Sequence, residues 1–179
     1  MRVLSSSRPP AGSVVLVGFM GAGKTSVGKA LGEKLGWAFE DLDDRIQARI
    51  GCTIEHIFHK HGEPCFRRAE TAALREMLAE ATEPRVIALG GGAFAQAANR
   101  IILRQAQACT VFLDAPAPEL FRRCRLDGAR RPLLRDLKQF RELHQQRRPC
   151  YLKAALHIRT AGKQVADIAT EVACSLGII

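Results

Sequence analysis

The residues best suited to chemistry lie in one segment, 18–25, which reads GFMGAGKT. The segment matches the pattern GxxxxGK(S/T), follows an apolar run of strand length and precedes a helical pattern, which is the context that the pattern requires. Glycines let backbone N–H groups surround a phosphate, and the N-terminus of the helix adds partial positive charge. The lysine reaches the β- and γ-phosphates, and the Ser or Thr hydroxyl is a ligand for Mg²⁺. The residues expected to hold a nucleoside triphosphate are therefore Gly21, Ala22, Gly23, Lys24, Thr25 and Ser26.

This segment predicts nucleotide binding but leaves the reaction open, because GTPases, motor ATPases and small-molecule kinases share it. Two carboxylates, Asp41 and Asp43, follow a second strand-like run at 38–41. Ligands bind at the carboxyl edge of an open parallel sheet, and side chains two apart in an extended chain point to one side. One carboxylate can then hold Mg²⁺ through a water while the other accepts a hydrogen bond from a substrate hydroxyl. The alternative is that Asp43 only caps the helix that follows.

Three glycines and an arginine supply further candidate groups. Gly90, Gly91 and Gly92 follow the third strand-like run, where their backbone can lie close against a substrate. Arg67 lies on a predicted helix, and Glu70 three residues later can hold its guanidinium in place. The alternatives are a flexible strand exit for the glycines and a surface ion pair for Arg67.

The elements that must position these groups alternate between strands and helices. Strands are expected at 13–18, 38–41, 85–89, 109–113 and 155–159, and helices at 23–35, 43–50, 54–61, 63–81, 96–107, 119–126, 136–151 and 164–176. Such alternation predicts an α/β fold with a parallel sheet covered on both faces. We expect residues 13–179 to form one domain and residues 1–12 to form a disordered arm.

Composition excludes several classes of protein. The 179 residues are 47% hydrophobic and 25% charged, which is typical of a soluble globular chain and not of a disordered or fibrous one. The longest apolar runs have strand length, so no transmembrane helix is expected. The N-terminus lacks an apolar stretch of signal-peptide length, and we therefore expect a cytoplasmic protein. His56, His59 and His61 lie together without a second ligand group, which favours a solvated helix face over a zinc site.

The net charge of +9 is concentrated in one stretch. From Glu119 to Lys153 there are eleven Lys or Arg residues and four Asp or Glu residues, so this stretch carries +7 and the rest of the chain +2. Such a patch suits nucleic acid or a compact polyanion such as a nucleotide. Because its aromatic residues are few, namely Phe121, Phe140 and Tyr151, the nucleotide is favoured.

Six segments together resemble the shikimate kinase family. They are GFMGAGKT at 18–25, FEDLD at 39–43, IFHKHGEPCFRRAE at 57–70, LGGGA at 89–93, RRPLL at 130–134 and RRPCY at 147–151. The resemblance implies a three-layer α/β/α P-loop kinase fold like that of nucleoside monophosphate kinases, with a five-stranded parallel sheet in the order 2-3-1-4-5 and a mobile lid at about 122–135. It also implies that ATP, with Mg²⁺, phosphorylates the 3-hydroxyl of shikimate, a step of aromatic amino acid biosynthesis. The protein would be a cytoplasmic monomer without nucleic acid or membrane partners.

The resemblance also implies roles for single residues. Asp43 would bind the shikimate hydroxyls nearest the attacking oxygen, and Arg67 and Arg147 would hold the substrate carboxylate. Lys24, together with Arg131 from the lid, would neutralise charge on the transferring phosphate. The remaining assignments are Thr25 and Asp41 near Mg²⁺, the backbone of Gly90, Gly91 and Gly92 against the substrate, and Phe58 and Phe66 lining its pocket. The residue types suit this chemistry, because planar arginine forks bind a carboxylate in a two-pronged geometry that lysine cannot match.

One position departs from the family pattern. Cys124 stands where the family often has an arginine that stacks on adenine. Arg123 or Arg125 can serve instead, and Lys163 or Gln164 can also meet the base. Two other functions stay open: another small-molecule P-loop kinase, acting on gluconate or a nucleotide, and a nucleic-acid-binding protein whose phosphate loop is a remnant.

Overall fold

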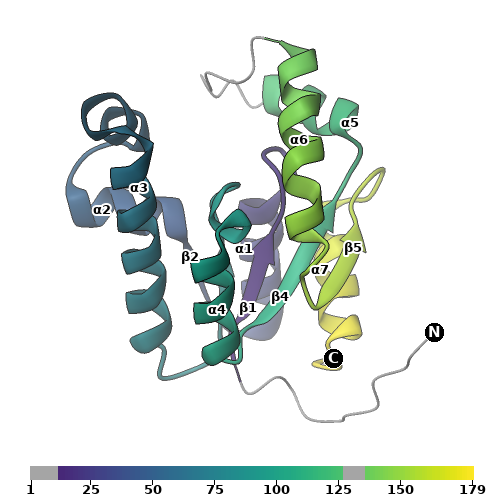
Figure 1. The fold of residues 1–179 in the computed structure, drawn as a ribbon. Coiled ribbons are helices and arrows are strands. Elements are labelled where there is room, and N and C mark those ends of the chain that lie inside the picture. Colours follow the sequence, from purple (N-terminus) through teal and green to yellow (C-terminus); the bar gives the residue numbers. More distant parts are fainter. Residues whose placement is uncertain (1–11, 127–135) are drawn as a thin grey trace.

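The computed structural model describes residues 12–126 and 136–179 of the chain. Its centre is a five-stranded sheet in which all neighbouring strands run parallel (Figure 1). The strands are β1 (Val14–Val17), β2 (Ala38–Asp41), β3 (Arg85–Ala88), β4 (Cys109–Asp114) and β5 (Leu156–Arg159). They lie in the order β2-β3-β1-β4-β5, which confirms the order expected from the resemblance.

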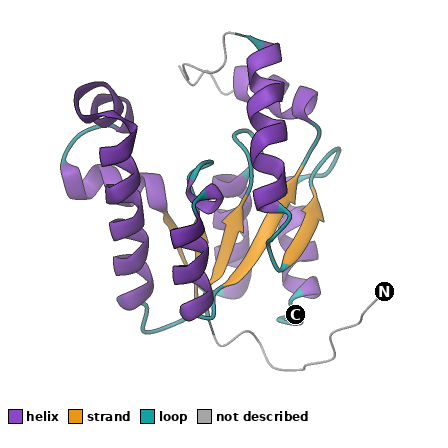
Figure 2. Cartoon of the chain, viewed as in Figure 1, coloured by secondary structure: helices purple, strands orange, loops and turns teal. Residues whose placement is uncertain are grey.

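Helices cover both faces of the sheet, so the three predicted layers are present (Figure 2). Helices α1 (Lys24–Leu35) and α7 (Val165–Ser175) pack against each other on one face, and α4 (Ala97–Gln105) and α6 (Leu137–Tyr151) lie on the other. The remaining helices are α2 (Leu42–Ile50) and α3 (Ile54–Ala79) at the β2 edge, the short 3-10 helix η1 (Ala93–Ala95) after β3, and α5 (Ala117–Leu126) after β4.

Burial follows the position of each strand in the sheet. The central strand β1 reads VVLV and all four residues are buried, as expected for a parallel strand with helices on both faces. The edge strands β2 and β5 are only partly buried. Among the described helices, none combines the length and apolar character needed to cross a membrane.

Helix α3 bends at Gly62, where the two helices predicted at 54–61 and 63–81 meet. Gly62 has φ 74° and ψ 170°, values that glycine adopts readily because it has no Cβ. Pro64, two residues later, has no N–H to donate. The predicted break is confirmed, and it separates a first half that carries Phe58 from a second half that carries Arg67.

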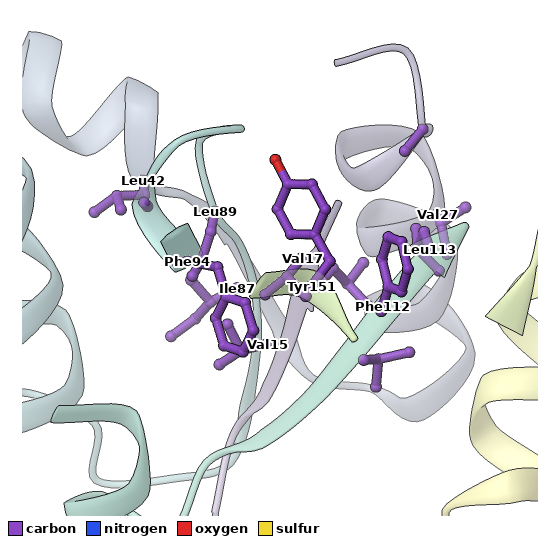
Figure 3. Close-up of a cluster of buried hydrophobic side chains, with 14 of the residues drawn as sticks. Val15, Val17, Val27, Leu42, Ile87, Leu89, Phe94, Phe112, Leu113 and Tyr151 are labelled. Carbon is purple, nitrogen blue, oxygen red and sulfur yellow. The ribbon is translucent and has the colours of Figure 1, made fainter. Parts of the chain in front are cut away.

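The core contains several aromatic rings under the carboxyl ends of the strands. Tyr151, Phe19, Phe112 and Phe140 are all less than 2% exposed, and burying an apolar side chain contributes about 1.5–3 kcal/mol. The Tyr151 ring stacks on Phe112 of β4, with ring centroids 5.3 Å apart. Its hydroxyl points away from the labelled apolar side chains (Figure 3), so one polar atom of the core faces the edge where the strands end.

Candidate active site

Three segments that carry predicted site residues meet at one edge of the sheet. The phosphate-binding loop at 18–23 follows β1, Asp41 ends β2, and the glycines at 90–92 follow β3. Because β3 lies between β1 and β2, the carboxyl ends of three neighbouring strands bring these segments together. Ligands of open α/β sheets bind at such an edge.

The phosphate-binding loop depends on glycine at its centre. Gly21 has φ 78°, and a Cβ on it would lie 2.6 Å from the carbonyl oxygen of Leu120 in α5. Both the backbone conformation and the close contact therefore disfavour any other residue. Lys24 Nζ donates to the carbonyl oxygens of Gly18 and Phe19, at 3.0 Å each, so its ammonium group lies over the loop.

Phe19, the second residue of the loop, joins the loop to α6. Its buried ring meets Phe140 edge-to-face, with centroids 5.0 Å apart. The guanidinium carbon of Arg147 lies 6.0 Å from the Phe19 centroid. Arg147 therefore stands beside the phosphate-binding loop, although 129 positions of sequence separate Gly18 from it.

A cavity of about 520 Å³ opens beside this loop, a volume typical of a small-ligand site. Six of the seven residues predicted to bind the nucleotide, from Gly21 to Ser26, line it, and the seventh, Arg131, lies outside the described residues. The lining also includes Arg122 and Arg123 of α5 and Lys163 and Gln164 before α7. The cavity thus combines a phosphate-binding loop with cationic side chains.

Of the two arginines predicted to meet adenine, Arg123 lines the cavity. It donates to the hydroxyl and carbonyl oxygens of Thr160, at 3.3 and 2.9 Å, and pairs with Glu119. Arg125 is not among the described residues of the cavity wall. Cys124 is buried, and its Sγ would lie 2.8 Å from a Cβ on Gly21, so it packs beneath the phosphate-binding loop.

Thr25 and Asp41, the residues predicted for Mg²⁺, are hydrogen-bonded to each other. Thr25 Oγ1 donates to Asp41 Oδ2 at 2.8 Å. The other carboxylate oxygen of Asp41 accepts from the N–H of Asp43 at 3.0 Å, and Asp41 is the N-cap of α2. The alternative that Asp43 caps this helix is therefore wrong, because Asp43 lies within its first turn.

The glycines at 90–92 are surrounded by the predicted acceptor residues. A Cβ on Gly90 would lie 2.6 Å from Oδ1 of Asp43. A Cβ on Gly92 would lie between 2.5 and 2.8 Å from the guanidinium atoms of Arg67. Both side chains occupy space that only a residue without a Cβ leaves open, so the close approach explains the glycines better than a flexible strand exit does.

Arg147 reaches the same loop from α6. Its Nη1 would lie 3.9 Å from a Cβ on Gly91, and the backbone nitrogen of Met20 would lie 3.7 Å from that Cβ. The middle glycine is therefore next to the phosphate-binding loop as well as to Arg147. Helices α2, α3 and α6 thus each bring one predicted acceptor residue to a single loop.

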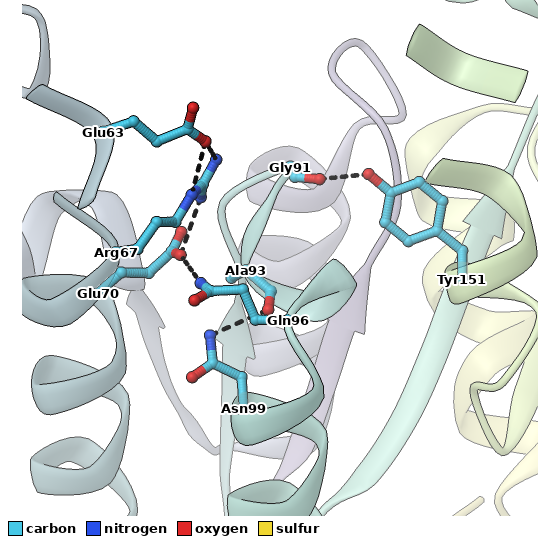
Figure 4. Close-up of polar contacts among 8 residues, drawn as sticks. All are labelled: Glu63, Arg67, Glu70, Gly91, Ala93, Gln96, Asn99 and Tyr151. Carbon is cyan, nitrogen blue, oxygen red and sulfur yellow. Dashed lines mark hydrogen bonds and ion pairs between the residues drawn. The ribbon is translucent and has the colours of Figure 1, made fainter. Parts of the chain in front are cut away.

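Arg67 is held by two carboxylates of its own helix (Figure 4). It donates to Glu63 at 3.0 and 3.1 Å and to Glu70 at 2.9 Å. The Glu70 side chain is 1% exposed, so the Arg67–Glu70 pair is not a surface ion pair.

Burial would lower the pKa of Arg67, but Glu70 and Glu63 raise it above the usual value. Burial raises the pKa of Glu70, with Asp43 adding to the rise and Arg67 and Arg147 opposing it.

Two further contacts at this loop have no signal in the sequence. Gln96 donates to Glu70 Oε2, and Tyr151 donates to the carbonyl oxygen of Gly91 (Figure 4). The partners are 26 and 60 residues apart, so no periodicity connects them. Oε1 of Glu70 accepts no hydrogen bond from a described residue. It would lie 3.3 Å from a Cβ on Gly90, so this carboxylate oxygen faces the glycines.

Phe58 and Phe66 pack together across the bend of α3, with ring centroids 4.5 Å apart. Phe66 is buried, whereas Phe58 is 37% exposed. The guanidinium carbon of Arg67 lies 5.2 Å from the Phe66 centroid, so the two rings form an apolar wall next to Arg67. Arg131 and the lid residues 127–135 lie outside the described residues.

Comparison with known proteins gives consistent matches over most of the chain. The family model for shikimate kinase matches residues 20–176. The shikimate kinase of Geobacter sulfurreducens is 42% identical over 164 residues, which are 90% of this chain and 88% of the relative. Shikimate kinase from Acinetobacter baumannii, solved in complex with shikimate, has a TM-score of 0.82 at 39% identity and covers 90% of each chain.

A more distant match separates fold from function. A gluconokinase from Sinorhizobium meliloti has a TM-score of 0.64 at 22% identity, covering 96% of this chain and 94% of its own. This likeness concerns the fold alone, since one fold hosts many functions. The family model and the curated relatives carry the assignment, and by them this chain belongs to the shikimate kinase family.

Proposed function

We propose that this protein transfers the γ-phosphoryl group of ATP to the 3-hydroxyl of shikimate, a step of aromatic amino acid biosynthesis. The observation that carries the proposal is the convergence of Asp43, Arg67 and Arg147 on the glycines at 90–92, next to the phosphate-binding loop. Two arginines and a carboxylate suit an acceptor that has one carboxylate and several hydroxyl groups.

The nucleotide is proposed to bind in the 520 Å³ cavity. Its phosphates would contact the backbone N–H groups at 21–23 and the side chains of Lys24, Thr25 and Ser26, at the N-terminus of α1. Lys24 would exchange its two carbonyl partners for β- and γ-phosphate oxygens, and a charged partner makes the stronger hydrogen bond. Arg123, already held by Thr160, would form one side of the base site.

Thr25 and Asp41 fit a Mg²⁺ site, because the hydroxyl and a carboxylate oxygen lie 2.8 Å apart beside the phosphate-binding loop. Protein sites for Mg²⁺ usually supply one or two such oxygens and leave the other positions to water and phosphate. When bound, the ion neutralises charge on the phosphate oxygens. The Asp41 carboxylate is also fixed by the N–H of Asp43, so its orientation is set by the start of α2.

On the acceptor side, Arg67 and Arg147 are proposed to hold the carboxylate of shikimate. Glu63 and Glu70 fix the plane of the Arg67 guanidinium before substrate arrives. The apolar ring face of shikimate would lie against Phe58 and Phe66. The N–H groups of the glycines at 90–92 can approach the substrate closely, because these residues carry no side chain of their own.

Asp43 is proposed to orient the 3-hydroxyl for in-line attack on the γ-phosphorus. As the new O–P bond forms and the bond to ADP breaks, the hydroxyl proton passes to the Asp43 carboxylate. Phosphoryl transfer has a loose transition state that needs little help from a base, so positioning is the larger part of this role. Lys24 stays on the β- and γ-phosphate oxygens throughout.

The remaining features of the proposal concern the lid and the cellular setting. Arg131 would bring a further positive charge to the transferring phosphate from a lid at 122–135, whose closure excludes water that would otherwise hydrolyse ATP. We also propose that the domain at 13–179 works as a cytoplasmic monomer, with no nucleic acid or membrane partner and with no catalytic part for the arm at 1–12.

The arginine clamp predicts a selective loss of acceptor binding. Arg67→Lys and Arg147→Lys keep the charge but lose the planar fork, so each should raise the KM for shikimate by roughly tenfold or more, the effect of losing one charge-assisted hydrogen bond. The KM for ATP should change little. Arg68→Lys, at an exposed neighbouring position of α3, is the matched control. A rise in the KM for ATP instead would assign these arginines to the nucleotide.

Gly92→Ala tests whether the close approach of Arg67 to the loop matters for binding. Gly92 has φ −101°, which alanine accepts, but the added methyl would lie between 2.5 and 2.8 Å from the Arg67 guanidinium. The flexible end of Arg67 must move, so we expect a raised KM for shikimate and a Tm close to that of the wild type. A large fall in Tm with an unchanged KM would show that the contact is structural only.

A coupled assay of ADP release tests the proposed function directly. ADP release should depend on shikimate and should be near background with gluconate, with a nucleoside monophosphate, or without an acceptor. Equal rates with gluconate would support another small-molecule kinase. Salt-sensitive DNA binding without ATP turnover would support the nucleic-acid-binding alternative.

A further inference from the structure

The hydroxyl of Tyr151 lies between two parts of the candidate acceptor site. Tyr151 is the last residue of α6, and its ring has no exposed surface. Stacking on Phe112 fixes the ring, and the hydroxyl donates to the carbonyl oxygen of Gly91 (Figure 4). Packing of the ring therefore determines where the hydroxyl is, and the hydroxyl in turn holds the middle of the glycine loop.

The same hydroxyl interacts with Arg147. Arg147 precedes Tyr151 by four residues, so α6 places both side chains on one face. Burial raises the pKa of Tyr151 to about 12, although the charge of Arg147 and a hydrogen bond from it act in the opposite direction. The hydroxyl therefore keeps its proton at neutral pH, donating it to Gly91 while its oxygen accepts from Arg147.

The glycine loop uses its carbonyl groups within the protein. The carbonyl oxygens of Gly90 and Gly92 accept from backbone N–H groups three residues later, at 3.1 and 3.2 Å. The carbonyl oxygen of Gly91 accepts from Tyr151, so N–H groups are what this loop can offer a ligand. In a planar trans peptide, the C=O of one residue and the N–H of the next point in opposite directions. Because the Gly91 carbonyl points toward Tyr151, the N–H of Gly92 points away from Tyr151.

We propose that Tyr151 is a positioning residue for the acceptor, whose hydroxyl fixes the Gly91–Gly92 peptide and the Arg147 guanidinium in one arrangement before the acceptor binds. This inference rests on the proposed function, because it takes the acceptor to meet both groups. Three consecutive glycines have a wide conformational range, and an arginine side chain has many rotamers. A single buried hydroxyl restricts both, which lowers the entropy lost when the acceptor is bound.

Tyr151→Phe removes the hydroxyl and keeps the ring that stacks on Phe112. We expect the KM for shikimate to rise by about five- to tenfold, the effect of losing one or two hydrogen bonds, and the KM for ATP to change by less than twofold. In the double variant with Arg147→Lys, the KM for shikimate should rise by less than the product of the two single-variant increases, because Tyr151 acts partly through Arg147. Fully multiplicative effects, or equal rises in both KM values, would contradict the proposal.

Val172→Ala is the matched control for stability. Val172 is fully buried in α7, which packs against α1 and β5, whereas the glycine loop follows β3. Truncating Val172 should therefore lower Tm without changing the ratio of the two KM values. If Val172→Ala shifts that ratio as much as Tyr151→Phe does, the effect comes from general destabilisation and the positioning role is refuted.

NMR of protein labelled with ¹⁵N-glycine tests the loop without any substrate. In Tyr151→Phe the Gly92 amide resonance should move and its hydrogen exchange should accelerate, whereas the amide of Gly177 near the C-terminus should not change. An unchanged Gly92 amide overturns the inference. Absence of shikimate-dependent turnover in the wild type would overturn the proposed function instead, and the amide measurement would still decide whether Tyr151 orders the loop.

Discussion

Replacing Lys24 by Met is expected to reduce shikimate-dependent ADP release by about 10²–10³-fold, the usual effect of removing a fixed electrostatic donor from a transition state. The ammonium group lies 3.0 Å from two carbonyl oxygens of the phosphate-binding loop, so it is already beside the loop that is proposed to hold the phosphates. Methionine keeps most of the length of the side chain and removes its charge. The measurement is steady-state turnover with saturating ATP and shikimate, together with Tm.

Lys29→Met provides the matched control for this prediction. Lys29 is an exposed residue of the same helix, so its replacement changes the net charge of the protein by the same amount without touching the loop. It should retain turnover within about twofold of the wild type, since surface substitutions away from special features have small effects. If folded Lys24→Met protein also retains normal turnover, the assignment of the phosphate-binding loop fails.

Asp43→Asn is expected to lower kcat by roughly 10²–10⁴-fold, the range for loss of a positioned base. The lower end of this range is expected, because the loose transition state of phosphoryl transfer needs little base assistance. Stability should change little, because the helix cap is supplied by Asp41, whose carboxylate accepts from the backbone N–H of residue 43. Asparagine at 43 retains that N–H, and it can still hydrogen-bond through a neutral side chain.

Asp44→Asn is the control that isolates the position of the charge. Asp44 is the next residue of the first turn of α2 and is exposed, so its loss removes the same charge from the same helix end. Turnover of Asp44→Asn should resemble that of the wild type, while that of Asp43→Asn should not. Equal turnover in the two variants, measured with Tm on the same preparations, would leave Asp43 without a part in the reaction.

The groups that act as contiguous segments could be predicted from the sequence alone. The phosphate-binding loop consists of eight successive residues between a strand and a helix, so the local sequence is enough to predict it. The break in α3 was also local, because Gly62 and Pro64 are two residues apart. The convergence of Asp43, Arg67 and Arg147 depends on the path of the chain, and only the family resemblance gave it before the structure did.

The choice between Arg123 and Arg125 shows why some positions stay open. Residues two positions apart in an α-helix are separated by about 200° around its axis, so Arg123 and Arg125 face nearly opposite sides. The buried residues Leu120 and Cys124 establish which side of α5 faces the protein. Charged residues at 122, 123 and 125 hide this period in the sequence, and the contact of Cys124 with Gly21 becomes visible only in three dimensions.

The distribution of the site along the chain has a consequence for how such proteins diversify. The proposed nucleotide side is mostly one uninterrupted stretch, and its Gly21 leaves no room for a Cβ against α5. A substitution there is expected to impair phosphoryl transfer to any acceptor. The proposed acceptor side is assembled from side chains of three separate helices around one loop. Changes at Phe58 or Arg147 are therefore expected to alter which hydroxy acid is accepted and to leave the binding of ATP largely unchanged. A library of variants restricted to these acceptor positions should therefore be sufficient to select for new acceptor specificities.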